Sequence, residues 1–347
     1  MPSREAVLEA LGRVIDPELR RPITELDMVR ELRLDDGLVA VTIALTVAGC
    51  PLRGSFQDQV AREVGGVAGV ESVELSFDVM TPDERQALTQ KLRGGVTERS
   101  KGISLDASTR VLAICSGKGG VGKSMLSANL AAAFSRLGRS TGILDADVYG
   151  HSIPHILGIR QRPVLVDRMI IPPVKDDLKL MSIGFFIDDN EPVMWRGPML
   201  HRALEQFLSD VHWGELDMLV VDMPPGTGDV AISLGQLLPR AEVLVVTTPQ
   251  PAAQEVAMRA AVMAQKTSMR LIGAVENMSG EVFGTGGGQR LADELGVPLL
   301  ATIPLDPRLR EAADAGETLL TPEIAALAER VDALRAGTIR KPLTVVS

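Results

Sequence analysis

The sequence predicts an α/β protein in which a doubly wound, mostly parallel sheet forms the larger domain and a small α+β domain precedes it. The length of 347 residues suggests two domains, because domains of ~150 residues are typical. Near residue 110 the pattern changes to short apolar runs that alternate with helical patterns, which is typical of parallel strands covered by helices on both faces. Residues 93–108 are rich in Gly, Ser, Thr and charge and lack apolar periodicity. We therefore expect domains at residues 1–92 and 109–347, joined by a linker at 93–108.

Apolar periodicity in the first domain predicts helices and strands in a mixed order. A helical pattern comes first, alternating patterns follow it, and a second helical pattern separates the strands. This arrangement indicates a small α+β fold. The expected helices cover residues 4–14 and 52–64, with another after Thr81, and the expected strands cover 31–34, 38–47 and 70–79.

The second domain shows strand–helix alternation from its start. The run VLAIC predicts a strand that leads into a glycine-rich loop, and SMLSANLAAAFSRLG predicts the helix after that loop. Aromatic residues make up only 3% of the chain, so the core must be built mainly from Leu, Val, Ile and Ala. Further apolar runs predict the remaining strands: TGILDAD, LDMLVVDMPPG, AEVLVVTTP, RLIGAVENM and PLLATIP.

Composition narrows the class of protein. The net charge of -9 disfavours general nucleic-acid binding, which needs a basic surface. No run reaches ~18 apolar residues, and the opening MPSREAVLEALGRV mixes acids and bases in an amphipathic pattern, so we expect no membrane span and no signal peptide. The two cysteines, Cys50 and Cys115, are too few for a disulfide framework and fit a reducing cytoplasm. We therefore expect a soluble cytoplasmic protein without a nucleic-acid or membrane partner.

The stretch CSGKGGVGKS, residues 115–124, matches the phosphate-binding pattern G-x-x-x-x-G-K-[S/T]. Its glycines let the loop turn backbone N–H groups inward, and the helix expected near Lys123 directs its N-terminal dipole at the same phosphates. Lys123 is expected to contact the β- and γ-phosphates, and Ser124 to bind Mg²⁺. Lys118 is a further lysine that the pattern does not require. The residues expected to bind nucleotide in this P-loop are Gly117, Lys118, Gly119, Gly120, Val121, Gly122, Lys123 and Ser124.

Three aspartates follow apolar strands and are expected to complete a nucleotide site. Asp145 and Asp147 end one strand and Asp222 ends another, and the carboxyl ends of parallel strands gather at one edge of a sheet. We expect Asp145 and Asp222 to hold Mg²⁺ through bound water, Asp147 to position the attacking water, and Gly226 to offer its N–H to the γ-phosphate. Taken singly, Asp145 could instead cap a helix, and Asp222 could be a solvated strand end.

These residues carry a resemblance to a known family that covers nearly the whole chain. The segments GKGGVGKS, DADVYGHSIP, VMWRGPML, VVDMPPGTGD, VENMSG, FGTGGG and IPLD resemble the Mrp/ApbC ATPases, a branch of the deviant P-loop class that includes MinD, ParA and the nitrogenase iron protein. In the first domain, DPEL at residues 16–19 and VAGCP at residues 47–51 resemble the small SufT-type domain that often precedes such ATPases.

The resemblance implies a role for the additional lysine. In this class the first lysine of the loop, here Lys118, reaches across a two-fold interface, so that ATP is enclosed in a homodimer. The implied catalytic residues are thus Lys118, Lys123 and Asp147. Asn277 matches the asparagine that reads adenine, and Pro304, at the end of a strand, is expected to line the base. A turn-forming role for Asn277 is the alternative.

The cysteines depart from the family pattern. Relatives that carry iron–sulfur clusters usually have C-x-x-C between ENMS and the glycine-rich element, whereas this chain has only GEVFGTGGG there. A cluster normally needs four thiolate ligands. Cys115 ends a core strand and is expected to be a small buried residue rather than a ligand. Cys50 matches the SufT-type cysteine and is expected at a helix N-terminus, which would favour a thiolate, as a possible cluster ligand or reactive thiol.

Two classes of function remain open on the sequence. The first is an ATPase that binds iron–sulfur clusters and transfers them to apoproteins or works with assembly factors. The second is a MinD- or ParA-like dimer that positions a partner and holds no cluster. The acidic residues Glu329 and Asp332 in IAALAERVDALRAG argue against a basic membrane-binding helix, and the net charge argues against a DNA-binding face. The role of Trp195 and Arg196, in VMWRGPML, is left open between partner contact and packing.

Overall fold

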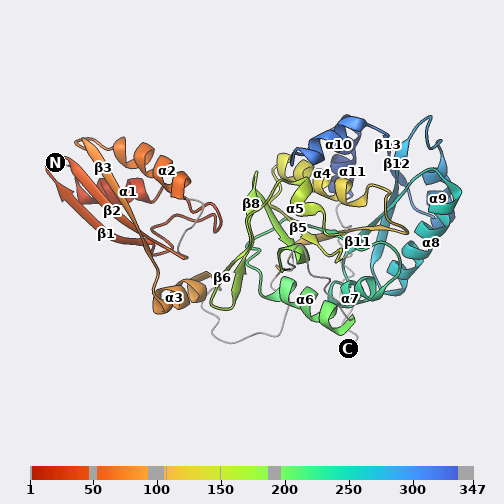
Figure 1. Ribbon diagram of the computed structural model, residues 1–347, viewed down its shortest axis with the longest axis horizontal. Helices are drawn as coiled ribbons and strands as arrows, with labels where there is room; N and C mark the ends of the chain where they lie inside the picture. Colours follow the sequence, from red (N-terminus) through yellow and green to blue (C-terminus); the bar gives the residue numbers. More distant parts are fainter. Residues whose placement is uncertain are drawn as a thin grey trace, which may run out of the picture. The chain divides into compact units, whose positions relative to one another are not determined.

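The computed structural model describes residues 2–46, 53–92, 105–106, 108–148, 150–186 and 197–334. The chain forms two compact units (Figure 1). The N-terminal unit comprises Met1–Ser104 together with Arg162–Val174 and Ser209–Gly214, and the P-loop unit comprises Leu105–Gln161, Lys175–Leu208 and Glu215–Ser347. The boundaries predicted at 92 and 109 stay predictions, because most residues between them lie outside the described part of the chain.

The N-terminal unit has a three-stranded sheet with the order β1-β2-β3, in which β1 and β2 are antiparallel and β2 and β3 are parallel. The expected elements form, with ends that differ by a few residues. The first helix stops at Leu11 rather than at Val14, because Arg13 and Val14 continue with tighter i to i+3 hydrogen bonds. The bounds are α1 Arg4–Leu11, β1 Val29–Asp35, β2 Leu38–Leu45, α2 Arg53–Gly65, β3 Ser72–Val79 and α3 Pro82–Leu92.

A hairpin from the middle of the chain completes the core of this unit. The strands β6 (Val164–Val166) and β7 (Met169–Ile171) pair in antiparallel fashion, and Ile170 also exchanges backbone hydrogen bonds with Asp210 and His212. Val166, Met169 and Ile171 are buried in the same hydrophobic cluster as Leu88 of α3. The Thr89 hydroxyl of α3 donates to Asp167 Oδ2 in the hairpin turn at 3.4 Å. The N-terminal unit is therefore built from three separate parts of the sequence.

The P-loop unit contains an eight-stranded sheet with the order β13-β12-β11-β4-β10-β5-β9-β8, and all pairings from β13 through β9 are parallel. Helices cover both faces, as Figure 1 shows for α4 and α11 on one side and α7 and α8 on the other. The doubly wound fold predicted from the sequence is therefore confirmed. The strands are β4 Arg110–Ser116, β5 Thr141–Asp145, β8 Val174–Lys175, β9 Leu178–Ser182, β10 Met218–Asp222, β11 Glu242–Thr247, β12 Arg270–Ser279 and β13 Leu299–Pro304.

The helices of the P-loop unit follow their strands in sequence. No helix among the described residues is both long and apolar enough to cross a bilayer. The bounds are α4 Lys123–Arg136, α5 Ile153–Ile156, the 3-10 helix η1 Ile183–Phe186, α6 Gly197–Ser209, α7 Asp229–Leu237, α8 Pro251–Lys266, α9 Gly287–Leu295, α10 Pro307–Asp314 and α11 Pro322–Ala333.

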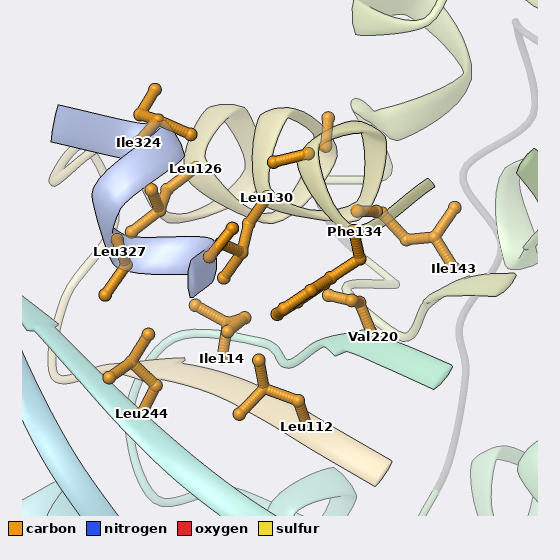
Figure 2. Close-up of a cluster of buried hydrophobic side chains, with 14 of the residues drawn as sticks. Leu112, Ile114, Leu126, Leu130, Phe134, Ile143, Val220, Leu244, Ile324 and Leu327 are labelled. Carbon is orange, nitrogen blue, oxygen red and sulfur yellow. The ribbon is translucent and has the colours of Figure 1, made fainter. Parts of the chain in front are cut away.

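The core of this unit fixes α4, and with it the loop that precedes α4. Figure 2 shows Phe134 of α4 between Leu112 of β4 and Val220 of β10, while Leu327 of α11 closes the cluster from the other side. Phe134 and Leu112 are both 0% exposed. Burial of a side chain of this size stabilises the fold by about 1.5–3 kcal/mol. The packing therefore holds the N-terminus of α4 against the carboxyl ends of β4 and β10.

Candidate nucleotide site

The predicted phosphate-binding loop runs from the end of β4 at Ser116 to the start of α4 at Lys123. Two of its glycines are required by close contacts. A Cβ on Gly117 would lie 2.0 Å from the backbone carbon of Val256 in α8, so α8 packs directly on the loop. Gly122 has a φ of +81°, and a Cβ there would lie 2.3 Å from Asn277 Nδ2. The loop is therefore held from both sides at positions where only glycine fits.

Lys123 and Ser124 both contact Asp222 at the end of β10. Asp222 Oδ2 accepts hydrogen bonds from Lys123 Nζ at 2.7 Å and from Ser124 Oγ at 2.6 Å. Lys123 and Asp222 are buried, with 5% and 0% exposure. The structure thus brings together the lysine, the hydroxyl and the carboxylate that the sequence assigned to phosphate and Mg²⁺. A magnesium nucleotide would have to draw Lys123 and Ser124 away from Asp222.

Asp145 lies beside Asp222 in the sheet, and both of its carboxylate oxygens have donors. Its Oδ2 accepts from Ser182 Oγ at 2.9 Å, and its Oδ1 accepts from the backbone N–H of Asp147 at 3.2 Å. Burial, and then the charge of Asp222, raise the pKa of the Asp145 carboxyl well above its usual range. Asp145 therefore shapes the turn that leads to Asp147. Its predicted contact with magnesium-bound water stays a prediction.

Asp147 faces the P-loop lysine from the turn after β5. Its Oδ2 lies 3.5 Å from Lys123 Nζ, and its Oδ1 accepts from the N–H of Gly150 at 3.0 Å. The residue as a whole is only 6% exposed. This location beside Lys123 is compatible with a carboxylate that orients water, which is the role predicted for Asp147.

Lys118 differs from Lys123 in its surroundings. It is exposed, as are Gly119 and Gly120, and only its backbone carbonyl is engaged, by Ser116 Oγ at 3.0 Å. Within the described part of the chain, the Lys118 ammonium has no hydrogen bond or ion pair. The side chain is thus available to a group outside its own subunit, although its role across an interface stays a prediction.

The two residues expected near the base lie on neighbouring strands. Asn277 is in β12, and Pro304 ends β13, where it pairs with Ser279. Asn277 is 8% exposed, and its Nδ2 donates to the carbonyl of Val121 at 2.8 Å. Its position within a strand contradicts the alternative of a turn-forming residue. One N–H of the Asn277 amide therefore fixes the P-loop, and adenine contact stays a prediction for Asn277 and Pro304.

Sequence reasoning missed several contacts of the site. Ser127 donates to the second oxygen of Asp222 at 2.6 Å. The N–H of Gly226 donates to the carbonyl of Ser116 at 2.8 Å, and its contact with the γ-phosphate stays a prediction. Both contacts join residues about a hundred positions apart, and local patterns carry no signal for them.

A buried glutamate of β12 organises the segment that leads to α9. Glu276, next to Asn277 in β12, accepts from the N–H of Gly288 at 2.6 Å, from Ser279 Oγ at 2.8 Å and from the N–H of Gly286 at 3.2 Å. Gly280 and Gly284 exchange backbone hydrogen bonds of 2.9 and 2.7 Å across the turn. The segment is therefore a short, closed loop without cysteine.

The possible cluster ligands are few. Cys115 is 4% exposed, so the prediction that it is a buried residue is confirmed, and burial raises the pKa of its thiol to about 12 although Lys123 opposes the shift. The described residues contain no group of three or more His, Cys, Asp or Glu side chains that could hold a metal ion. Cys50, Trp195 and Arg196 lie outside the described residues.

Family models match both parts of the chain. Residues 107–336 match the model described as NUBPL iron-transfer P-loop NTPase. Residues 4–75 match the model described as iron-sulfur cluster assembly protein. The first match spans more than half of the sequence and includes every residue of the candidate nucleotide site.

Curated relatives match over most of their length. An iron-sulfur cluster carrier protein of Mycobacterium tuberculosis is 52% identical over 332 residues, with coverage of 91% of this chain and 87% of that protein. A protein of the same name in Bacillus subtilis is 42% identical, with coverage of 87% and 88%.

Solved structures match the P-loop unit. A nucleotide-binding protein from Archaeoglobus fulgidus in complex with ADP is 33% identical, with a TM-score of 0.54 and coverage of 62% of this chain and 90% of that chain. The MinD protein of Pyrococcus horikoshii, complexed with Mg-ADP, shares the fold at 24% identity, with a TM-score of 0.51 and coverage of 65% and 97%.

Proposed function

Because this chain belongs to the family of NUBPL-like iron-transfer P-loop NTPases, we propose that it hydrolyses ATP with Mg²⁺ and transfers iron–sulfur clusters to apoproteins. The observation that carries the ATPase part is the contact of Lys123, Ser124 and Asp222 at the end of a P-loop. The cluster part rests on the family and on the named relatives.

The residues present fit a magnesium nucleotide. Ser124 and Asp222 supply the oxygen ligands that Mg²⁺ prefers, directly or through water. When bound, the ion neutralises charge that develops on the transferred phosphate. Lys123 and the loop N–H groups hold the phosphates, Asp147 orients the attacking water, and Asn277 and Pro304 contact the base.

Turnover is proposed to be slow and to depend on closure of a homodimer. The support is the exposed Lys118, which has no partner among the described residues and lies at the entrance of the loop. A second subunit that brings Lys118 to the opposite side of the phosphates would add positive charge where the transition state needs it, as an arginine finger does. The support for apoproteins as partners is the carrier name of the relatives.

The two cysteines of this chain are fewer than the four thiolate ligands that a cluster normally takes. Its two cysteines are Cys50 and Cys115, and burial raises the pKa of the Cys115 thiol to about 12, which disfavours a thiolate at that position. Two subunits therefore bring two usable thiolates, whereas a cluster normally takes four protein ligands. We infer that the cargo is completed by thiolates from outside the chain, supplied by a small thiol or by the donor or recipient protein.

Anaerobic reconstitution tests this proposal. The full chain is incubated with iron and sulfide, with and without a small thiol, and bound cluster is read from thiolate-to-iron absorbance. We expect cluster binding only with the thiol, its loss in Cys50→Ala and its retention in Cys115→Ala. Transfer to an apo-ferredoxin should follow. Failure to bind iron under any condition, in protein that still hydrolyses ATP, would favour the MinD- or ParA-like alternative.

One feature argues against the membrane form of that alternative. The helix α11 is amphipathic, but its apolar residues Ile324, Leu327 and Val331 are buried in the core of the P-loop unit. Arg110 also donates to the carbonyl of Val331 at 2.6 Å. The apolar face of α11 is therefore already used for packing.

A further inference from the structure

Ser127 contacts the site from beneath, one turn into α4. Its side chain is 0% exposed. Its Oγ lies 2.6 Å from Asp222 Oδ1 and 2.9 Å from the carbonyl oxygen of Lys123. Both neighbours are acceptors and a serine hydroxyl has one proton, so the hydroxyl favours the charged and closer carboxylate.

The two oxygens of Asp222 have different tasks. Oδ2 faces the nucleotide side, where it accepts from Lys123 and Ser124, and Oδ1 faces α4, where it accepts from Ser127. A nucleotide that engages Lys123 and Ser124 would remove both donors from Oδ2. The hydrogen bond from Ser127 does not have to break. Of the three hydrogen bonds to Asp222, it is therefore the one that would keep the carboxylate in place.

We propose that Ser127 is a positioning residue that holds Asp222 while its other oxygen passes from Lys123 and Ser124 to the hydration shell of Mg²⁺. The inference rests on the proposed nucleotide function. Without Ser127, Oδ1 of a fully buried carboxylate would have no donor among the residues that the structure describes, and an unsatisfied buried charge favours rotation or withdrawal of the group. Partners that orient metal-binding groups typically contribute 10–100-fold to metal affinity.

The test measures how much Mg²⁺ strengthens ADP binding by the full chain, from titrations of a fluorescent ADP in Mg²⁺ and in EDTA. In Ser127→Ala, the ratio of the ADP affinity in Mg²⁺ to the ADP affinity in EDTA should fall by roughly tenfold. The ADP affinity in EDTA should stay near that of the wild type. Ser135→Ala is the matched control, because Ser135 lies on the same helix and its hydroxyl donates to the carbonyl of Asp176, away from Asp222. It should behave as wild type.

A double-mutant cycle separates positioning from general destabilisation. The double variant Asp222→Ala with Ser127→Ala should show the same Mg²⁺ effect on ADP binding as Asp222→Ala alone, because Ser127 acts through Asp222. If Ser127→Ala does not fold, Ser127→Cys keeps the volume but is a weak donor, and it should show the same loss.

An unchanged Mg²⁺ effect in the folded Ser127 variant, or a further loss in the Asp222→Ala background, would overturn the positioning role alone. A wild-type chain that binds no ADP would overturn the proposed ATPase function as well.

Discussion

At the scale of single residues, the buried pair of Lys123 and Asp222 serves both the fold and the site. Lys123 is 5% exposed and contacts two carboxylates, Asp222 at 2.7 Å and Asp147 at 3.5 Å. Removal of one partner of a buried ion pair typically costs 3–5 kcal/mol, because the other charge stays buried without compensation. Loss of nucleotide binding in a Lys123 variant therefore needs a control for stability.

Lys123→Ala should abolish nucleotide binding and also lower the free energy of unfolding by about 3–5 kcal/mol. The double variant Lys123→Ala with Asp222→Asn should regain part of that stability, because the buried charge has gone, but should still not bind ATP. Urea unfolding and ATP titration of the two variants check both parts. Tight ATP binding by either variant would remove Lys123 from the site.

Lys118 is predicted to act on the nucleotide of the partner subunit. Lys118→Ala should bind ATP through Lys123 and the loop but lose hydrolysis, and Asp147→Ala should do the same. In a heterodimer of one Lys118→Ala and one Asp147→Ala subunit, a Lys118 that acts across the interface leaves one nucleotide site with both substitutions and the other site with neither. Some ATPase activity should therefore return. Verified heterodimers without any regained activity would mean that Lys118 serves its own subunit.

Glu18 should make the N-terminal unit less stable as pH rises. Burial, and then the charge of Asp16, raise the pKa of Glu18 from 4.5 to about 7. Between these values the folded state holds more protons than the unfolded state, so stability falls from pH 4.5 to 7 and levels off above. Glu18→Gln should remove this loss, with a gain over wild type that grows to at most about 3 kcal/mol above pH 7.

Urea unfolding of both proteins between pH 4.5 and 8 measures the effect. Glu5→Gln, at an exposed position of α1, controls for the change of charge. A difference between Glu18→Gln and wild type that is the same at every pH would show that Glu18 titrates alike in the folded and unfolded states.

At the scale of elements, the close packing of the P-loop against α8 leads to a prediction about two nearby glycines. Gly117→Ala would place a Cβ 2.0 Å from the backbone of α8, whereas Gly119→Ala would meet nothing within 4 Å. Gly117→Ala should therefore destabilise the ligand-free protein by several kcal/mol, since backbone cannot give way as a flexible side chain can, and Gly119→Ala by less than about 1 kcal/mol. Thermal unfolding of the two variants compares them, and equal destabilisation would contradict the close contact.

Six strands of the parallel sheet could be predicted because each contains a largely apolar run, whereas β9, with the sequence LKLMS, could not, because Lys179 interrupts its apolar pattern. VLAIC, for example, corresponds to β4 with one residue added at either end. The strands β6 and β7 could not be predicted, because each has only three residues, which is too few to show a periodicity. The residues that they pack against lie in α3, some 75 residues away in sequence. In the site, the P-loop pattern located Lys123 and Ser124, but the contacts of Ser127 and Glu276 depend on how strands and helices meet.

At the scale of the whole molecule, the N-terminal unit includes the β6–β7 hairpin, which follows α5 in the sequence of the P-loop ATPase. Val166, Met169 and Ile171 are at most 2% exposed within the cluster they share with α3. A fragment that begins at the linker would keep this hairpin but lose α3 and the rest of that core. The units are thus not independent pieces of chain.

The fragment 105–347 should therefore aggregate more than the full chain. Replacement of Val166 and Ile171 by Ser in the fragment should reduce its aggregation, because the newly exposed apolar surface shrinks. The same pair of replacements in the full chain should destabilise the N-terminal unit by several kcal/mol, since both side chains are buried there. Light scattering of the fragments and urea unfolding of the full-length proteins test these opposite effects. A fragment as soluble as the full chain would argue against the shared core.

The buried Cys115 also determines how this molecule can be labelled for spectroscopy. Because it is 4% exposed and burial raises the pKa of its thiol to about 12, we expect no reaction with maleimide or methanethiosulfonate reagents while the protein is folded. The natural sequence has only one other sulfhydryl, so a nitroxide or fluorophore that attaches to the folded chain attaches at Cys50. Pulsed electron paramagnetic resonance could then measure one distance between two identical probes, and follow assembly with ATP without any engineered cysteine.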